Sequence, residues 1–228
     1  MRQRVLMLGV LLAASSCIAQ KPIRQTLMIG PRKIAYDVFG ENTIGPTLII
    51  LHSASGPMMT LNWQQTKFFT SHGYRVLMPH YFDATRSSEP SDANYSMWAQ
   101  VVEKLVEESS QSSIPAQRKT MLLGFSLGAS VALAAGSQRA KVAAIAEWYG
   151  SLPDTFFYKM KGMPPLLILH GGRDQTIPVI NALQLIKLCG LKQLTCDSHI
   201  YAKQGHGFDS GSVKDADSRT LAFFDRFR

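Results

Sequence analysis

Residues 119–133 read Lys-Thr-Met-Leu-Leu-Gly-Phe-Ser-Leu-Gly-Ala-Ser-Val-Ala-Leu, and they indicate the architecture of the whole chain. An apolar run ends in Gly-Phe-Ser-Leu-Gly, and an alanine-rich helical pattern follows at once. This succession predicts a buried strand, a sharp turn at Ser126 and a helix, which is the context of a G-x-S-x-G nucleophile elbow. By residue frequencies alone the three fixed letters recur about 0.1 times in a chain of this length. The pentapeptide therefore needs an acid and a histidine downstream to support it.

Each residue type in this turn has a physical reason. A serine on a strained turn projects its Oγ above the sheet. Glycine is expected at positions 124 and 128 because the helix and the strand cross so closely that a Cβ would clash. The helix that begins at Leu127 directs free N–H groups and the positive end of its dipole toward Ser126, where an oxyanion would form.

Length and composition fit one domain that spans residues 20–228. The chain has 228 residues, of which 46% are hydrophobic and 18% charged, so it can bury a sizeable core. The formal net charge of +8 would suit nucleic acid, but lysine and arginine are scattered, without basic runs or interleaved aromatics. We expect no nucleic-acid partner. His72, His80 and His199 have no partner at ligand spacing, so we expect neither a metal site nor a cofactor.

The first 19 residues have the pattern of a signal peptide. Arg2 and Arg4 precede an apolar run over residues 5–14, and small residues follow. Because the run is too short to cross a bilayer, we expect no stable membrane span. The small residues after the run predict cleavage after Ala19. The protein would then be exported, either periplasmic or secreted. The alternative is an imperfect lipobox that leaves Cys17 lipidated at the mature N-terminus.

Strands and helices alternate over the rest of the chain. Besides the strand before Ser126, apolar runs predict strands over residues 25–29, 33–39, 46–52, 74–79, 142–149, 165–170 and 195–201. Besides the helix after Ser126, helical spacing predicts helices near 63–71, 95–109, 177–189 and 212–227, with a polar loop over 81–94. The first two strands form an antiparallel hairpin through Gly30-Pro31. The pattern predicts an α/β fold whose mostly parallel sheet has helices on both faces.

Two cysteines remain after removal of the signal peptide. Cys189 and Cys196 lie where a predicted helix ends and the last predicted strand begins. In an oxidising compartment such a pair can form a disulfide. Two buried thiols are the alternative that the spacing leaves open.

Three strand ends carry residues suited to nucleophilic catalysis. Ser126 follows one strand, Asp174 comes just after the strand that ends at His170, and His206 follows the final strand. The carboxyl ends of parallel strands meet at one edge of a sheet. Neutral His206 would take the proton of Ser126, and Asp174 would fix the imidazole tautomer. The chain order Ser, acid, His is that of the α/β-hydrolase fold.

An acyl-transfer site also needs donors for the oxyanion. We expect the N–H of Leu127 to supply one of them, together with an N–H from the loop after His52. Ala54 is the first choice in that loop, and Ser53 is the second.

Other residues near these strand ends have structural interpretations. His52 and His170 each end a strand, and we expect both to be structural. Asp209 could replace Asp174 as the acid, but it is too near His206 in sequence to reach behind the ring easily. Tyr149 could fill the core or wall the pocket.

The segment between the strand after the elbow helix and the next strand is too short for a helical lid. Only residues 150–163 separate the two strands, so we expect no large lid. The site should then be a shallow, open cleft with little apolar surface for long chains, and it should favour short acyl groups. The aromatic side chains that we expect to wall this cleft and contact substrate are Tyr81, Trp148, Phe156 and Phe208. Arg86 and Arg173 would favour a substrate that carries a carboxylate, unless Arg173 has a structural partner.

Four segments together resemble the dienelactone hydrolase family of α/β-hydrolases. They are Gly-Phe-Ser-Leu-Gly-Ala (124–129), Trp-Tyr-Gly-Ser-Leu-Pro (148–153), Leu-His-Gly-Gly-Arg-Asp-Gln-Thr-Ile-Pro (169–178) and Gly-His-Gly-Phe (205–208). The resemblance runs over roughly residues 45–228. It implies one compact domain that hydrolyses small esters or lactones. We expect a monomer or a small homo-oligomer.

One residue departs from the family pattern. The dienelactone hydrolases proper carry cysteine at the elbow, whereas this chain has Ser126, which favours a general carboxylic-ester hydrolase that forms an acyl-enzyme. An exported, non-catalytic binding protein on the same fold is the alternative. An intact set of Ser126, Asp174 and His206 argues against it, because a binding protein has no reason to keep all three. The post-strand glycines do not fit the Gly-x-Gly-x-x-Gly pattern of a dinucleotide site.

Overall fold

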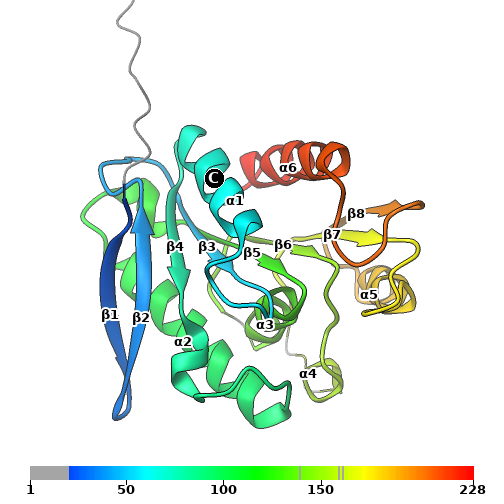
Figure 1. Ribbon diagram of the computed structural model, residues 1–228, viewed down its shortest axis with the longest axis horizontal. Helices are drawn as coiled ribbons and strands as arrows, with labels where there is room; N and C mark the ends of the chain where they lie inside the picture. The colour runs from blue at the N-terminus through cyan, green and yellow to red at the C-terminus, as the bar shows by residue number, and fades with distance from the viewer. Residues whose placement is uncertain (1–20, 139, 159, 161) are drawn as a thin grey trace, which may run out of the picture.

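A computed structural model describes residues 21–138, 140–158, 160 and 162–228. Within these residues eight strands form one sheet in the order β1-β2-β4-β3-β5-β6-β7-β8, with the β1–β2 hairpin at one edge and β8 at the other (Figure 1). The strands are β1 (Ile23–Ile29), β2 (Arg32–Phe39), β3 (Thr47–Leu51), β4 (Arg75–Pro79), β5 (Thr120–Phe125), β6 (Ala144–Trp148), β7 (Leu166–Gly171) and β8 (Cys196–Tyr201).

Helices connect these strands. The α-helices are α1 (Thr60–Ser71), α2 (Asp92–Ser110), α3 (Leu127–Ser137), α4 (Asp154–Tyr158), α5 (Ile180–Leu191) and α6 (Ser210–Asp225), and the 3₁₀ turns are η1 (Tyr81–Ala84) and η2 (Pro115–Arg118). Strands β3 to β8 run parallel to one another, while β1 is antiparallel to β2 and β2 to β4. The hairpin and the mostly parallel sheet predicted from the sequence are therefore confirmed.

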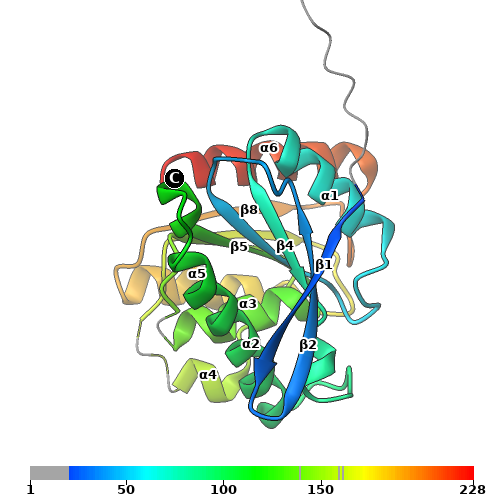
Figure 2. The same cartoon turned by 90° about the vertical axis from the view of Figure 1, so that its left-hand side faces the viewer.

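The sheet lies between two layers of helices. Helices α1 and α6 cover one face, and α2 to α5 lie on the other (Figure 2). Side chains alternate between the faces along each strand, so Leu48 of β3 joins the core under α1 and α6, whereas the neighbouring Ile49 joins the core under α2, α3 and α5. Every residue of β3, β5, β6 and β7 is buried, which explains why these strands read as continuous apolar runs.

Two segments differ from the sequence-based expectation. The expected polar loop over residues 81–94 contains η1 and the first turn of α2, which Ser91 caps by accepting a hydrogen bond from the Asn94 N–H at 3.1 Å. The segment over residues 150–163 holds the five-residue helix α4. This short helix is no large lid, as expected.

Cys189 and Cys196 form a disulfide with a Cα–Cα distance of 6.1 Å. It joins α5 to the start of β8, so the bridged alternative is confirmed. The expected signal peptide over residues 1–19, with Cys17, lies outside the described residues. No helix in the described part of the chain has the length and apolar character to cross a membrane.

Candidate active site

Ser126 occupies the turn between β5 and α3 with φ +54° and ψ −118°. Its N–H donates to the Trp148 carbonyl at 3.0 Å, which fixes the turn against β6. The two flanking glycines are required by close approach: a Cβ on Gly124 would lie 2.4 Å from the Gly128 oxygen, and one on Gly128 would lie 2.1 Å from the Leu51 oxygen. The local sequence therefore produces a strained turn that presents the serine hydroxyl above the sheet.

His206 lies between Ser126 and Asp174. Its Nε2 is 2.8 Å from the Ser126 Oγ, and its Nδ1 is 2.8 Å from the Asp174 Oδ2. The other oxygen of Asp174 accepts the N–H groups of Thr176 and Ile177, both at 2.8 Å. The side chain of Asp174 is fully buried, whereas His206 is 24% exposed and borders the cleft. The structure thus brings the three residues singled out in the sequence into one line of hydrogen bonds.

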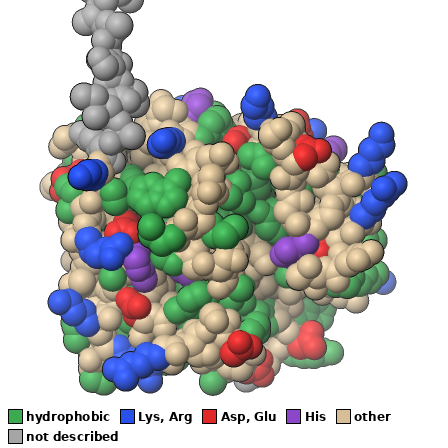
Figure 3. All heavy atoms as spheres, in the orientation of Figure 1, with side chains coloured by type: hydrophobic (Ala, Val, Ile, Leu, Met, Phe, Trp, Pro, Cys, Tyr) green, Lys and Arg blue, Asp and Glu red, His purple; other side chains and the backbone are tan. Residues whose placement is uncertain are grey.

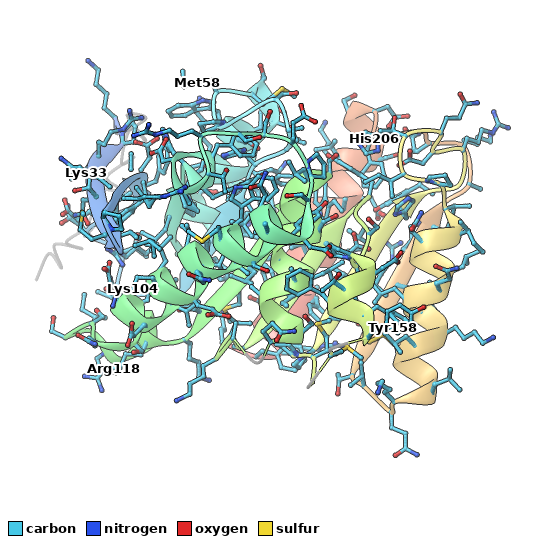
Figure 4. The ribbon with its side chains drawn as sticks, turned by 90° about the horizontal axis from the view of Figure 1, so that it is seen from below. Lys33, Met58, Lys104, Arg118, Tyr158 and His206 are labelled. Carbon is cyan, nitrogen blue, oxygen red and sulfur yellow. A yellow bond between two sulfur atoms is a disulfide. The ribbon has the colours of Figure 1, made fainter. Side chains whose placement is uncertain are left out.

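The loops after β7 and β8 are held together by backbone contacts. The Arg173 N–H donates to the Gln204 carbonyl at 2.9 Å, and a Cβ on Gly171 would lie 2.2 Å from the Gly205 oxygen. These contacts place the loop of His206 directly against the loop of Asp174. His206 lies on the same side of the molecule as Met58, and Arg118 lies on the opposite side (Figure 4).

His170 and Asp209 have structural surroundings. The Nε2 of His170 lies 2.8 Å from the Ile177 carbonyl and 3.4 Å from the Asp174 Oδ2, and burial lowers the pKa of His170. A neutral His170 therefore supports the loop that carries Asp174. Asp209 accepts from the Ser212 N–H and from the Gln204 amide, so it caps α6 and does not contact His206.

The expected oxyanion donors lie around the same serine. Leu127 is the first residue of α3, so its N–H has no acceptor within the helix. Ser53 and Ala54 both line the cleft that holds Ser126. Among the hydrogen bonds of the described residues, neither of their N–H groups is a donor, whereas the Ser53 oxygens accept from Ser55 and Gly56.

The loop after β3 is held in place by contacts of His52 with Tyr81 and Ser53. The Tyr81 hydroxyl donates to the His52 carbonyl at 2.6 Å, and the two rings stack with centroids 4.2 Å apart. The Nδ1 of His52 lies 2.8 Å from the Ser53 carbonyl. Burial lowers the pKa of His52 to about 4, so the ring is neutral and donates through Nδ1. These contacts fix the backbone at His52 and Ser53, directly before Ala54.

Ser126 and His206 open into a cleft of about 820 Å³. It extends from the loop after β3 along α1 and α6. Hydrophobic side chains are visible in the upper part of the space-filling view, where these helices lie in the same orientation (Figure 3). The larger apolar side chains that line it are Met59, Leu61, Phe68, Phe125, Tyr149, Phe208 and Val213. The cleft therefore has more apolar lining than the sequence analysis expected.

Three of the four expected wall residues are core residues. Tyr81 and Trp148 are fully buried and Phe156 is nearly so, and none of them lines the cleft. The Trp148 Nε1 donates to the Thr220 Oγ1 at 3.1 Å, which turns the indole under α6. Phe208 lines the cleft as expected.

Tyr149 takes the place expected for Trp148. It has φ +47°, which bends the chain at the end of β6, and its ring lies 5.2 Å from that of His206 and 5.0 Å from that of Phe208. Burial raises the pKa of the Tyr149 hydroxyl, so it stays protonated. The sequence offered the aromatic pair but no sign of which ring faces the cleft.

No charged anchor for a substrate carboxylate was found where it was expected. Arg86 and Arg173 are absent from the described residues that line the cleft. Helices α1 and α6 instead supply much of the wall of the cleft. The sequence analysis missed these residues because nothing in the sequence indicates that the two helices meet beside Ser126. In the described part of the chain no group of three or more His, Cys, Asp or Glu side chains is arranged to hold a metal ion.

Comparison with known proteins gives a consistent result. The family model for the dienelactone hydrolase family matches residues 35–225. A Klebsiella pneumoniae protein described as a dienelactone hydrolase superposes with a TM-score of 0.72 at 16% identity, over 91% of this chain and 100% of that one. A dienelactone hydrolase from Anabaena variabilis superposes with a TM-score of 0.70 at 18% identity, over 91% of this chain and 99% of that one.

A carboxylesterase from Lactobacillus plantarum gives a TM-score of 0.65 at 13% identity, over 89% of this chain and 95% of that one. At these identities the structures share the α/β-hydrolase fold with the chain. No curated protein sequence matches it.

Proposed function

The chain belongs to the dienelactone hydrolase family and is a hydrolase of the carboxylic-ester type, and from this premise we propose that it cleaves small esters or lactones through an acyl-enzyme on Ser126. The observation that carries the proposal is the line of hydrogen bonds from Asp174 through His206 to the Ser126 Oγ, each 2.8 Å long. A serine hydroxyl is a weak nucleophile, and a neighbouring base held in one tautomer is what activates it.

The residues would act in sequence. His206 Nε2 takes the Ser126 proton as the Oγ attacks the carbonyl carbon, and the N–H groups of Leu127 and Ala54 bind the resulting oxyanion. The protonated ring then gives its proton to the leaving oxygen, which departs as an alcohol. A water molecule, deprotonated by His206, attacks the acyl-enzyme and releases the acid. Asp174 holds the Nδ1 proton and stabilises the charged ring throughout.

A binding protein on the same fold is the competing interpretation. It would not need a hydroxyl in a strained turn, nor a buried carboxylate behind the imidazole. The positive φ of Ser126 and the buried Asp174 favour the enzyme.

The experiment is labelling with a fluorophosphonate, combined with turnover of p-nitrophenyl butyrate. We expect the wild type to be labelled, and Ser126→Ala to lose both labelling and turnover, by about 10⁴-fold or more, because triad members act as a unit. Ser130→Ala, one turn further along α3, is the matched control and should keep both. Turnover by Ser126→Ala at the wild-type rate would refute the mechanism, and an unlabelled wild type would favour the binding protein.

We also propose that the protein is exported, with residues 1–19 as a cleaved signal peptide. The disulfide between Cys189 and Cys196 supports an oxidising compartment. Intact-mass analysis of protein from its native compartment tests this: a chain that begins at Gln20 is expected. A mature N-terminus at a lipidated Cys17 would support the lipoprotein alternative instead.

A further inference from the structure

The cleft that holds Ser126 is also lined by two buried polar residues that the proposed mechanism does not use. Gln65 of α1 is 1% exposed, and Asp217 of α6 is 7% exposed. They are 152 residues apart in the chain and meet only because α1 and α6 lie side by side on one face of the sheet. The Gln65 Nε2 donates to the Asp217 Oδ2 at 3.4 Å, which is a long hydrogen bond.

This pair presents two acceptors that lack a donor. Among the described residues, neither the Gln65 Oε1 nor the Asp217 Oδ1 has a hydrogen-bond partner, and both atoms are buried. Buried polar atoms are nearly always paired, so an orphaned pair beside a cleft requires an explanation. The apolar neighbours Leu61, Phe68 and Val213 cannot supply a donor. A group that enters the cleft can.

We propose that Gln65 and Asp217 form a specificity subsite that receives a hydroxyl group carried by the ester substrate. This inference rests on the proposed function, and it identifies the class of ester: one with a hydroxyl on the part of the molecule that lies between α1 and α6. The hydroxyl lies between the Gln65 Oε1 and the Asp217 carboxyl. It donates its single hydrogen to one of these two acceptors.

The charges around the pair disfavour a charged substituent on the substrate. A substrate carboxylate would face two acceptor oxygens and be repelled. A substrate ammonium would lose its hydration at a buried site and would pass Lys214, which lines the same cleft. His72 is the other titratable group that acts on Asp217.

The state of Asp217 fits a neutral partner. Burial raises the pKa of its carboxyl to about 7, although the Gln65 hydrogen bond and His72 act to lower it. At neutral pH the carboxyl therefore exchanges between its charged and protonated forms. When Asp217 is protonated, the hydroxyl accepts from the carboxyl and donates to the Gln65 Oε1. When Asp217 is charged, the hydroxyl donates its hydrogen to the carboxylate instead.

The test compares methyl hexanoate and methyl octanoate, each with and without a terminal hydroxyl, by kcat/KM. In the wild type we expect the hydroxyl to raise kcat/KM by about 10-fold at one of the two chain lengths, the effect of one buried hydrogen bond. In Gln65→Met/Asp217→Leu, which replaces both partners by apolar groups, the ratio should fall to about 1. Asp225→Asn, at the far end of α6, is the matched control and should keep the wild-type ratio.

Each outcome decides the question. Equal kcat/KM for both members of each pair in the wild type would overturn the subsite, as would an unchanged ratio in the double variant. A terminal ammonium that is preferred over the hydroxyl would also overturn it, in favour of a cation site. If the double variant does not fold, the ratio of kcat/KM for the hydroxylated and plain esters in Gln65→Met, compared with that in the wild type, still tests the subsite. Failure of the proposed function is distinct: it would appear as no turnover of any ester and no fluorophosphonate labelling of Ser126.

Discussion

Asp174 divides its carboxylate between two tasks. Its Oδ1 accepts the N–H groups of Thr176 and Ile177, and its Oδ2 faces the Nδ1 of His206. Because the two backbone N–H groups need an acceptor, an aspartate or asparagine at this position must direct an oxygen toward them and its other terminal atom toward His206. The residue therefore determines which nitrogen of His206 carries the proton.

Asp174→Asn should for this reason lower kcat by about 10⁴-fold with little change in stability. The amide oxygen must stay on the backbone donors, so the NH₂ group faces His206 and the ring proton moves to Nε2. That nitrogen then cannot accept the Ser126 proton. The measurement is kcat on p-nitrophenyl butyrate, with urea unfolding to monitor the fold.

Asp209→Asn is the control for this substitution, because Asp209 was the alternative acid. An asparagine can still cap α6, so activity should stay within about 2-fold of the wild type. A large loss in Asp209→Asn together with an active Asp174→Asn would reverse the assignment of the acid.

Glu147 is a buried carboxyl beneath the turn that follows β6. Its Oε2 accepts the Gly150 N–H at 2.8 Å, and its Oε1 has no partner among the described residues. Burial raises the pKa of Glu147 from 4.5 to about 8. The folded protein therefore binds this proton more tightly than the unfolded chain does.

The stability of the protein should fall as pH rises because of this group. Its contribution is fully present below pH 4.5, the pKa in the unfolded chain, and is lost as pH rises through about 8. Between roughly pH 5 and pH 8 we expect the free energy of unfolding to drop by about 2–4 kcal/mol. Asp217, with a pKa raised to about 7, acts in the same direction.

Urea unfolding of the wild type and of Glu147→Gln across this pH range checks the expectation. The variant should show a shallower decline and should exceed the wild type in stability at pH 8. Parallel curves for the two proteins would mean that Glu147 does not keep its proton in the folded state.

At the scale of elements, the contact of α3 with β3 depends on the absence of one side chain. A Cβ on Gly128 would lie 2.1 Å from the Leu51 oxygen and 2.4 Å from the His52 oxygen. The first atom belongs to β3 and the second to the residue directly after it, so both are backbone atoms that cannot easily move aside. Helix α3 can lie under Ser126 only with glycine at this position.

Gly128→Ala should cost about 3 kcal/mol or more, or prevent folding, because the overlap involves backbone on both sides. Gly190→Ala in α5 is the matched control, because a Cβ on Gly190 would have no atom within 4 Å among the described residues. Alanine there should stabilise the protein by about 0.5 kcal/mol through helix propensity. Thermal unfolding of both variants measures the contrast, and equal behaviour would disprove the close crossing.

At the scale of the whole molecule, the cleft is formed by the two helices on one face of the sheet and not by an inserted lid. Only the short helix α4 lies between β6 and β7 in the described part of the chain. An apolar cleft of about 820 Å³ can bind a medium acyl chain but cannot close over a long one.

We expect kcat/KM to peak at butyryl or octanoyl when acetyl, butyryl, octanoyl and palmitoyl esters are compared without detergent. Binding energy from the apolar wall of α1 and α6 raises kcat/KM until the chain outgrows the cleft. A maximum at palmitoyl, or activation at a lipid interface, would contradict this and indicate a lipase.

The sequence by itself determined the catalytic candidates, because their signals are local. Ser126 is marked by an apolar run and two glycines, and Asp174 and His206 each follow a strand end in a fixed chain order. The sheet could also be predicted from the sequence, because its buried strands are continuous apolar runs. The N-terminus of α2 was missed because the cap at Ser91 lies in a polar stretch that resembles a loop.

Only the tertiary structure decided what surrounds the serine. Trp148 and Tyr149 are adjacent aromatics, yet the Tyr149 ring lines the cleft and the Trp148 ring lies in the core. Gln65 and Asp217 lie on two helices whose meeting depends on the order of strands in the sheet. Local patterns record which residues are buried or begin a turn, but the wall of a cleft is set by contacts between segments far apart in the chain, which no local pattern contains.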